Sequence, residues 1–318
     1  MEPITIFTTT YNRKTLLYRL FLSIKKQTDH NFIWLIVDDG STDGTSKLVE
    51  SFMADTDVDF KIDYIKKKNG GKHTAMKIGF ERTQTKYMVE IDDDDELLPD
   101  AIETFIKVWQ DVEKDGCDNI AEIRALSINE NGIVSGQYNS ADNRLYFDSN
   151  YLKEDWYNNH HLENITSWRM DLVNPLNIFD IEHEWLYPNV KLVSESLFWN
   201  RIARVYDTRY LNKPLRLYHS DAEDSITLSR FSKQKCYNYV FSLRVIVNEL
   251  KIHGWKNPIH LIKYFFEYMS CGKAVNISAF ELIRNISAPY NKIICSLICP
   301  IGIMIGIYLR KQYSKINI

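Results

Sequence analysis

Five consecutive carboxylates, Asp92 to Glu96, directly follow the apolar run Tyr87 to Ile91. Like charges at adjacent positions repel one another, and burying one unpaired carboxylate costs several kcal/mol. The run must therefore be solvated, disordered or neutralised by a cation. Hard divalent cations such as Mg²⁺ and Mn²⁺ are bound by one or two carboxylates together with substrate phosphate oxygens. The run thus predicts either a solvated acidic turn or a site at which a metal ion bridges to a diphosphate.

Three other polar stretches precede the acidic run. They read TTTYNR (8–13), DDGSTDGT (38–45) and NGGKHTA (69–75). In the third, Lys72 follows two glycines, which let the backbone approach a phosphate or sugar oxygen closely. Neither the Gly-x-x-x-x-Gly-Lys-Ser/Thr loop nor the Gly-x-Gly-x-x-Gly fingerprint occurs in the sequence. Lys72 is therefore a candidate phosphate ligand or, alternatively, a solvated lysine.

Short β-branched and aromatic runs alternate with amphipathic stretches in the first third of the chain. This is the pattern of βαβ units on a mostly parallel sheet. The polar stretches lie at or just beyond the carboxyl ends of the predicted strands, and open sheets of this kind bind ligands at that edge. The predicted strands are Ile4 to Thr8, Phe32 to Val37, Lys61 to Ile65 and Tyr87 to Ile91.

In this order and at these intervals, TTTYNR, VDDGSTDGT, NGGKHTA and IDDDDELLPD resemble the motifs of family 2 glycosyltransferases of the bacterial surface-polysaccharide type. The resemblance covers roughly residues 3 to 220. It implies the GT-A fold, an α/β fold with a mostly parallel central sheet flanked by helices, here with a helical C-terminal extension. It also implies a nucleotide-sugar donor and Mn²⁺ or Mg²⁺ as the cofactor, with the acidic run as the D-x-D motif.

The resemblance assigns donor-binding residues to the first three polar stretches. Thr9 and Tyr11 match positions that line the nucleoside pocket, and Arg13 of the same stretch is grouped with them. Asp39 matches the aspartate that accepts a hydrogen bond from the base, and Lys72 is assigned to the phosphate or sugar of the donor. Two alternatives stay open: the Tyr11 ring in the core, and Asp39 as a cap of the turn that follows it.

Within the acidic run, Asp92-x-Asp94 matches the D-x-D motif. The resemblance then makes Asp94 the metal ligand and places Asp92 near the ribose or the metal-bound water. The family usually has a smaller residue where this chain has Asp93. Because four aspartates follow one another, the D-x-D motif also fits the sequence when it is shifted by one residue. We assign Asp92 and Asp93 to the donor and Asp94 to the metal.

The stretch SESLFWNRIA (194–203) resembles the segment that carries the catalytic base of the family at the start of a helix. Counting back from Arg201, Glu195 takes the place of the base, and Ser194 replaces the acid that often precedes it. Sugar transfer with inversion needs such a base near the acceptor hydroxyl. Alternatively, Glu195 only complements the helix dipole. For His219 two roles stay open: a contact with the metal or a phosphate, or an ordinary position in a loop.

The composition is that of a globular protein, with 318 residues of which 45% are hydrophobic and 25% charged. The net charge of −3 argues against a nucleic-acid partner. From Lys251 onward, however, nine basic residues stand against two acidic ones, which favours an anionic surface as partner. The five cysteines lack metal-site spacing and the N-terminus lacks a secretory pattern, so we expect reduced thiols and a cytoplasmic location.

Residues 293–309 form an uncharged apolar run of 17 residues, followed by Arg310, Lys311 and Lys315. This length is at the lower limit for a bilayer-spanning helix, and Pro300 would kink it. A buried core helix is one alternative. The sequence favours a helix that is embedded in the cytoplasmic face of the inner membrane, where basic residues meet anionic headgroups. We therefore expect a peripheral or monotopic protein.

Together these features predict a metal-dependent inverting glycosyltransferase, with a catalytic domain over residues 1–220 and a helical region over 221–318. It would move a sugar, by analogy from a UDP-sugar, to a hydroxyl of a lipid-linked glycan. One alternative is nucleotidyl transfer, whose glycine-rich triphosphate loop is missing after the first predicted strand. Another is a non-enzymatic Ca²⁺- or glycan-binding module, although the acidic run lacks the glycine and glutamate of an EF-hand.

Overall fold

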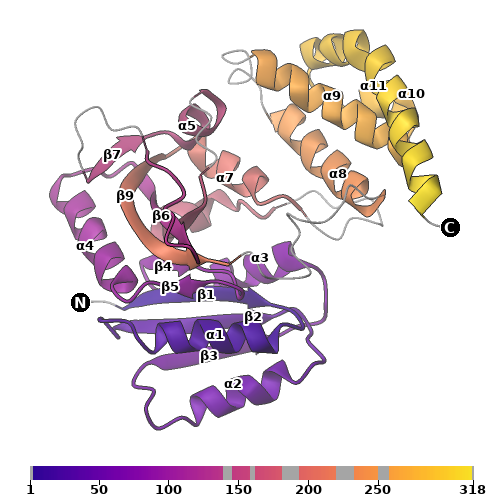
Figure 1. Cartoon of the computed structure of the whole chain (residues 1–318). Coiled ribbons are helices and arrows are strands. Elements are labelled where there is room, and N and C mark those ends of the chain that lie inside the picture. The colour runs from indigo at the N-terminus through magenta and orange to yellow at the C-terminus, as the bar shows by residue number, and fades with distance from the viewer. Residues whose placement is uncertain are drawn as a thin grey trace. The chain divides into compact units, whose positions relative to one another are not determined.

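The computed structural model describes residues 3–138, 145–157, 162–180, 193–219, 233–249 and 258–316. By its contacts the chain forms two compact units, which can be followed by residue number in Figure 1. The sheet unit comprises Met1–Phe179 and Trp199–Glu223, and the helical unit comprises Asp180–Phe198 and Asp224–Ile318. The chain therefore enters the helical unit twice. The predicted division at residue 220 stays a prediction.

Four parallel strands build the N-terminal half of the sheet, as the sequence predicts. The register pairs Thr10 with Asp38 and Asp38 with Lys66, so the first three strands end level with one another. The loops that follow them leave the sheet at the same edge. The strands are β1 (Ile4–Thr10), β2 (Phe32–Asp38), β3 (Lys61–Lys66) and β4 (Tyr87–Glu90), in the spatial order β3-β2-β1-β4.

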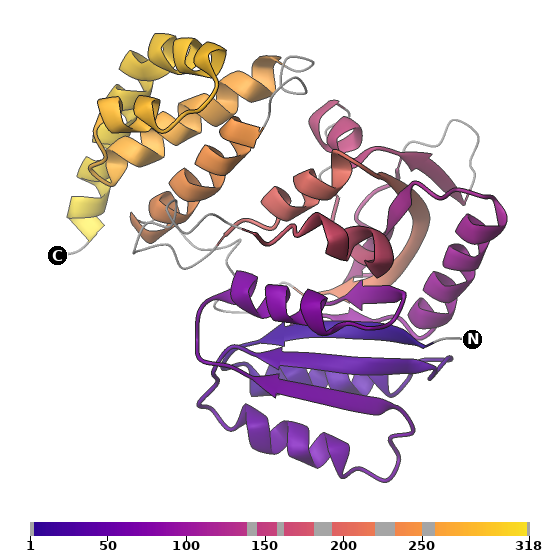
Figure 2. The same ribbon diagram turned by 180° about the vertical axis from the view of Figure 1, so that it is seen from behind.

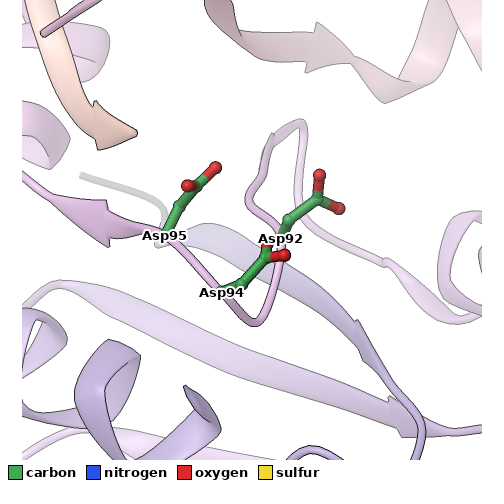
Figure 3. A group of neighbouring side chains, drawn as sticks. All are labelled: Asp92, Asp94 and Asp95. Atoms are coloured by element: carbon green, nitrogen blue, oxygen red, sulfur yellow. The ribbon is translucent and has the colours of Figure 1, made fainter. Parts of the chain in front are cut away.

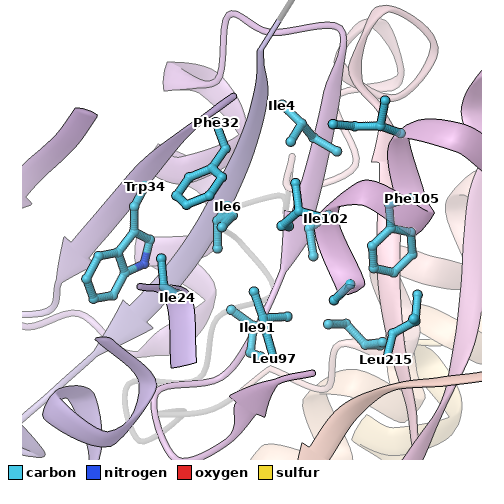
Figure 4. Packing of buried hydrophobic residues seen from close by; sticks show 14 of the residues in the cluster. Ile4, Ile6, Ile24, Phe32, Trp34, Ile91, Leu97, Ile102, Phe105 and Leu215 are labelled. Atoms are coloured by element: carbon cyan, nitrogen blue, oxygen red, sulfur yellow. The ribbon is translucent and has the colours of Figure 1, made fainter. Parts of the chain in front are cut away.

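Three amphipathic helices cover one face of this half. Alternate residues of β1, Ile4 and Ile6, point to this face together with Trp34 of β2, and they join one large hydrophobic core (Figure 4). In α4 the apolar residues recur with helical spacing and are buried, among them Ile102 and Phe105. The three helices are α1 (Lys14–Ile24), α2 (Thr45–Met53) and α4 (Ala101–Lys114).

The opposite face of the same half carries α3 (Lys72–Arg82). Phe7 of β1 packs edge-on against Phe80 of α3, with ring centroids 6.2 Å apart. A Cβ atom at Gly79 would lie 2.1 Å from the Phe7 ring, so α3 can approach the sheet this closely only with glycine at that position. This contact sets the position of α3, whose first residue is Lys72.

The C-terminal half of the sheet mixes strand directions. Next to β4 lies β8 (Asn164–Arg169), antiparallel to it, then β6 (Ile120–Asn129) and β9 (Asp207–Tyr218). β9 also pairs with β5 (Glu96–Leu97) and with β7 (Tyr146–Ser149). This pairing brings the end of β9 to the acidic run. The remaining elements here are α5 (Tyr151–Tyr157), α6 (Met170–Val173), η1 (Asn174–Leu176) and α7 (Ser196–Ala203), which passes from one unit to the other.

Four helices make up the described part of the helical unit, and Figure 2 shows them from behind. Gly302 and Gly306 of α11 (Pro289–Ile316) face α9 (Pro258–Ala274), and their lack of a side chain lets these two helices pack closely. The thiols of Cys236, Cys271 and Cys295 are buried, and none of these three cysteines forms a disulfide bond. The helices are α8 (Lys233–Glu249), α9 (Pro258–Ala274), α10 (Ala279–Arg284) and α11 (Pro289–Ile316).

The last helix also satisfies the length and composition of a membrane span over Pro289–Leu309, with a mean hydropathy of 2.1. Only 17% of its most apolar window is buried. A core helix of a soluble protein would be mostly buried, so this low burial argues against the alternative of a buried core helix.

Candidate active site

Basic side chains from two loops contact the acidic run. Arg13, between β1 and α1, places its Nη1 atom 3.1 Å from Oδ1 of Asp93 and 3.1 Å from Oδ2 of Asp94. Lys72, at the start of α3, places its Nζ atom 2.7 Å from Oδ1 of Asp92. The structure thus brings residues from three of the four polar stretches together at the carboxyl edge of the sheet.

Asp92, Asp94 and Asp95 gather between β4 and β5 (Figure 3). Each offers one carboxylate oxygen, and these three oxygens lie within 4.8 Å of one another. The Asp93 side chain is buried and contacts Arg13 instead. A cluster of three carboxylate oxygens fits a hard divalent cation, which takes oxygen ligands. The cluster includes Asp95, to which the sequence assigned no role.

Two of the carboxyl groups in the run are nearly inaccessible to water. Burial raises the pKa of both Asp93 and Asp95 to about 7. The nearby guanidinium groups, of Arg13 for Asp93 and of Arg216 for Asp95, offset only part of this effect. Desolvation therefore dominates, because a charged carboxylate is poorly solvated at these positions.

The other two aspartates of the run, Asp92 and Asp94, differ in their basic neighbours. Burial, and then the charge of Asp92, raise the pKa of Asp94. Burial would also raise the pKa of Asp92, but the positive charges of Lys72, Arg216 and Arg13 together hold that pKa below its usual value. The run thus carries more acidic groups than its basic neighbours neutralise, which favours the binding of a cation.

Two residues at the end of β9 hold Asp95 in place. The guanidinium group of Arg216 lies 3.1 Å from Oδ2 of Asp95 and 2.8 Å from Oε2 of Glu163, and its Nε donates to the Ser127 hydroxyl at 2.8 Å. The backbone N–H of His219 donates to Oδ1 of Asp95 at 3.1 Å. Both oxygens of Asp95 therefore have partners from β9. No local sequence pattern marks Arg216, because only the pairing of β9 with β5 brings it here.

The His219 ring lies between two glutamates. Its Nε2 atom is 2.8 Å from Oε1 of Glu96, and its Nδ1 atom is 2.6 Å from Oε1 of Glu130. Both ring nitrogens thus have carboxylate partners within the sheet unit. This arrangement favours a structural link between β5 and the end of β6 over a metal or phosphate contact.

Asp39 orders the loop between β3 and α3. Its Oδ1 accepts the backbone N–H of Gly70 at 2.9 Å, and its Oδ2 accepts that of Gly71 at 2.8 Å. The Lys67 ammonium group also pairs with Oδ1. Gly71 has a φ of +92°, which glycine adopts without steric cost. The carboxylate therefore fixes the backbone that leads directly into Lys72.

Other residues hold the turn after β2. Oδ1 of Asp38 accepts the backbone N–H of Ser41 at 2.7 Å, so the turn is capped by Asp38 and not by Asp39. The Ser41 hydroxyl accepts the N–H of Asn12 at 2.8 Å, which ties this turn to the loop after β1. Tyr11 is 46% exposed, which contradicts a core position for its ring. Thr9 lies half-buried near the end of β1.

The sequence model of glycosyl transferase family 2 matches residues 5–169, more than half of the chain. The chain belongs to glycosyl transferase family 2. The family match includes Arg13, Asp39, Lys72 and the acidic run 92–96. The segment with Glu195 lies beyond it.

Several curated proteins resemble this chain. A teichoic acid poly(glycerol phosphate) polymerase of Staphylococcus epidermidis is 32% identical over 113 residues, which are 36% of this chain and 16% of the polymerase. The glycosyltransferase GlyA of Streptococcus pneumoniae is 31% identical over 106 residues, which are 33% of this chain and 15% of the length of GlyA. A GalNAc(5)-diNAcBac-PP-undecaprenol beta-1,3-glucosyltransferase of Campylobacter jejuni is 22% identical over 79% of this chain and 76% of its own length.

Among solved structures, S. aureus TarS 1-349 in complex with UDP-GlcNAc is similar to this chain, with a TM-score of 0.63 at 15% identity. The similarity covers 98% of this chain and 92% of the TarS chain. At this identity the likeness concerns the fold. It confirms the predicted GT-A fold with helices in its C-terminal part.

Glu195, which the family resemblance assigns as the base, is half-buried and directly precedes α7. The backbone N–H of the preceding Ser194 donates to the Ser242 hydroxyl of α8 at 3.1 Å. Toward the other end of α7, the Arg201 guanidinium group donates to the backbone carbonyl of Ile178. The role of Glu195 as a base stays a prediction.

Proposed function

We propose that the protein transfers a sugar, with inversion, from a UDP-sugar to a hydroxyl group of a lipid-linked glycan in the synthesis of a bacterial surface polysaccharide. The observation that carries this proposal is the cluster of Asp92, Asp94 and Asp95 beside Arg13 and Lys72. Membership in glycosyl transferase family 2 supports sugar transfer. The UDP-GlcNAc complex of S. aureus TarS supports a UDP-sugar as the donor.

The metal cofactor in this proposal is Mn²⁺ or Mg²⁺. Asp94 would hold it, with Asp92 and Asp95 next to it, because these carboxylate oxygens are close enough to share one ion. When bound, the ion supplies positive charge that stabilises the diphosphate leaving group. Asp93, which is buried against Arg13, would keep the turn in shape.

The donor would bind along the loops at the carboxyl edge of the sheet. Arg13 and Lys72 each carry several N–H donors and would exchange one carboxylate contact for a phosphate oxygen. Asp39 uses three hydrogen bonds within the protein, and a carboxylate accepts about four, which leaves room for an N–H of the base. Thr9 and Tyr11 would line the nucleoside pocket.

Glu195 would act as the base. It takes the proton of the acceptor hydroxyl while that oxygen attacks the anomeric carbon and the bond from this carbon to the diphosphate breaks. Attack and departure occur on opposite faces of the sugar, so one displacement inverts the configuration. Proton transfer by a positioned carboxylate typically contributes about 10²- to 10⁴-fold in rate.

The acceptor and location follow from the relatives. The C. jejuni relative is named for a PP-undecaprenol-linked glycan, and the S. epidermidis relative for a teichoic acid polymer. We therefore propose a lipid-linked saccharide acceptor and a location on the cytoplasmic face of the inner membrane. The apolar helix α11 and the basic C-terminal quarter support contact with an anionic membrane surface.

The proposal is tested by incubating the full chain with UDP-sugars and Mn²⁺ and measuring the release of UDP. We expect one UDP-sugar to be hydrolysed slowly, EDTA to stop the reaction, and a polyprenyl-diphosphate-linked saccharide to accelerate it. Release of inorganic diphosphate from a nucleoside triphosphate would instead indicate nucleotidyl transfer. Ca²⁺-dependent glycan binding without any UDP release would indicate the non-enzymatic alternative.

A further inference from the structure

One side of α11 carries a row of large apolar side chains that are exposed. At helical spacing of three and four residues, the stripe follows a single face of the helix. Its exposure is high, with Leu297 at 75% and Met304 at 69%. Side chains of this size are usually scattered singly when they are exposed, so a contiguous row indicates an interaction surface. The α11 stripe consists of Ile293, Leu297, Ile301, Met304 and Tyr308.

The opposite side of α11 is fixed within the helical unit. A Cβ atom at Gly302 would lie 2.6 Å from Cβ of Met269, and one at Gly306 would lie 2.6 Å from Cβ of Lys273. The Asn291 side chain is buried and donates to the backbone carbonyl of Val247 in α8 at 2.7 Å. The helix therefore packs by its glycine side and presents the α11 stripe outward.

This packing argues against a membrane-spanning α11. A spanning helix would either leave its close contact with α9 or draw α9 into the hydrocarbon with it. The second course would bury Lys263, Glu267 and Lys273 of α9 at a cost of several kcal/mol. A helix that lies parallel to the membrane surface inserts only its exposed apolar side and keeps all of its internal contacts.

The charge of α11 identifies the partner of the stripe. Over residues 289–316 the sequence has four basic residues and no acidic residue. Lys311, which is exposed, lies on the same helical face as Ile293, five turns away. Two copies of this chain that paired through the stripe would bring basic residues together, whereas anionic lipid headgroups attract them at about 1 kcal/mol each.

We infer that the α11 stripe docks the protein flat on an anionic lipid bilayer, as a monotopic surface helix. The inference deepens the proposed function, since a lipid-linked acceptor is part of that proposal, but it is argued only from the geometry and charge of the helical unit. Docking through α11 places the chain on the surface that holds such an acceptor. It requires no segment that crosses the membrane.

Vesicle flotation with the full chain tests the inference. We expect the protein to float with vesicles that contain about 30 mol % phosphatidylglycerol in phosphatidylcholine, and about tenfold less with phosphatidylcholine alone. The combined variant Leu297→Ser, Ile301→Ser and Met304→Ser should lower flotation about tenfold or more, because each serine removes apolar area that enters the bilayer. Unchanged flotation of this variant would overturn the inference.

A matched variant controls for the loss of exposed apolar side chains. Met53, Ile133 and Val205 are exposed on the sheet unit, and their joint replacement by serine should leave flotation unchanged. Both variants should keep the circular dichroism of the parent, because all six side chains lie outside the core. If the parent does not float and sedimentation shows a dimer that only the stripe variant dissociates, a second copy covers the stripe and the inference fails.

Thiol labelling separates a flat helix from a spanning one. In a Cys117→Ser, Cys299→Ser background, Lys311→Cys on intact vesicles should react with a membrane-impermeant maleimide. Reaction only after detergent would show that α11 spans the bilayer. The stripe variant should retain Mn²⁺-dependent stabilisation by UDP, so a failure of docking and a failure of the proposed donor site give different results.

Discussion

Neighbouring aspartates of the acidic run have different surroundings. Asp93 is turned into the protein against Arg13, whereas Asp92, Asp94 and Asp95 bring their oxygens together. Asp94 is partly buried and pairs with Arg13. A side chain in that position can change partners when a cation and a diphosphate bind.

Replacing Asp94 tests the metal site. The variant Asp94→Asn keeps the size of the side chain but removes a charge, so we expect UDP with Mn²⁺ no longer to raise the melting temperature. Ligands that bind only the folded state raise apparent stability by mass action, which thermal shift measures. Asp118→Asn, at an exposed position outside the site, is the matched control. Equal Mn²⁺-dependent stabilisation of Asp94→Asn and the parent would refute the assignment.

Replacing Glu195 tests the catalytic base. Glu195→Gln preserves shape and removes basicity, so turnover should fall about 10²-fold or more while UDP binding is retained. Turnover is measured as UDP release in the presence of a lipid-linked acceptor. Glu81→Gln, an exposed glutamate of α3, should have normal turnover. Near-normal turnover of Glu195→Gln would leave Glu195 only a role at the start of α7.

β9 is the element that joins the acidic run to the rest of the sheet. Its short pairing with β5 places Arg216 beneath Asp95, and its parallel pairing with β6 places the same guanidinium group against Ser127. Arg216 is about 90% buried, so its charge depends on these partners. Loss of one member of such a buried pair leaves the other without compensation.

Replacing Arg216 tests this support. Arg216→Met should destabilise the folded protein by about 3–5 kcal/mol in urea unfolding, because Asp95 loses its buried counterion. Combining it with Asp95→Asn should recover part of that loss, by about 1 kcal/mol or more over the sum of the single effects. Arg82→Met, at an exposed arginine, should change stability by less than about 0.5 kcal/mol. Strict additivity of the two site substitutions would contradict the pairing.

The elements that the sequence predicts are those with local signals. The strands β1 to β4 are short apolar runs followed by polar turns, and each is stabilised by a helix next to it in the chain, so periodicity and turn residues suffice to find them. Residue chemistry alone indicates the acidic run and Lys72, and the resemblance of the turns to family motifs adds Arg13 to the site. The structure brings all of these residues to one edge.

The remaining parts of the site depend on contacts between distant segments. Antiparallel β8 and the two-residue β5 have too little periodicity to be read from the sequence. Asp95 is contacted by Arg216 of β9 and by His219, which directly follows β9. No local sequence pattern relates these two residues to Asp95. Neither does any pattern show which of the four adjacent aspartates turns inward, because the inward position of Asp93 depends on its contact with Arg13 from the loop after β1.

At the scale of the whole molecule, the proposed donor site and the proposed membrane surface belong to different units. All basic and acidic residues that we assign to the donor and metal lie in the sheet unit, and the α11 stripe lies in the helical unit. Glu195 belongs to the helical unit by its contacts, although its helix α7 continues into the sheet unit. The two proposed partners should therefore protect separate parts of the chain.

Hydrogen exchange measured by mass spectrometry tests this separation. UDP with Mn²⁺ should slow amide exchange in peptides covering residues 8–13, 38–45, 69–75 and 92–96, because ligand contacts suppress local opening. Exchange in α11 should not change. Anionic vesicles should have the opposite effect, slowing exchange in peptides that cover α11 and leaving the four loops unchanged. With the stripe variant as control, vesicles should protect neither region while UDP still protects the loops. Protection of α11 by UDP alone, or of the loops by vesicles alone, would show that the donor and membrane surfaces are one site, and the assignment of the two partners to two units would then be wrong.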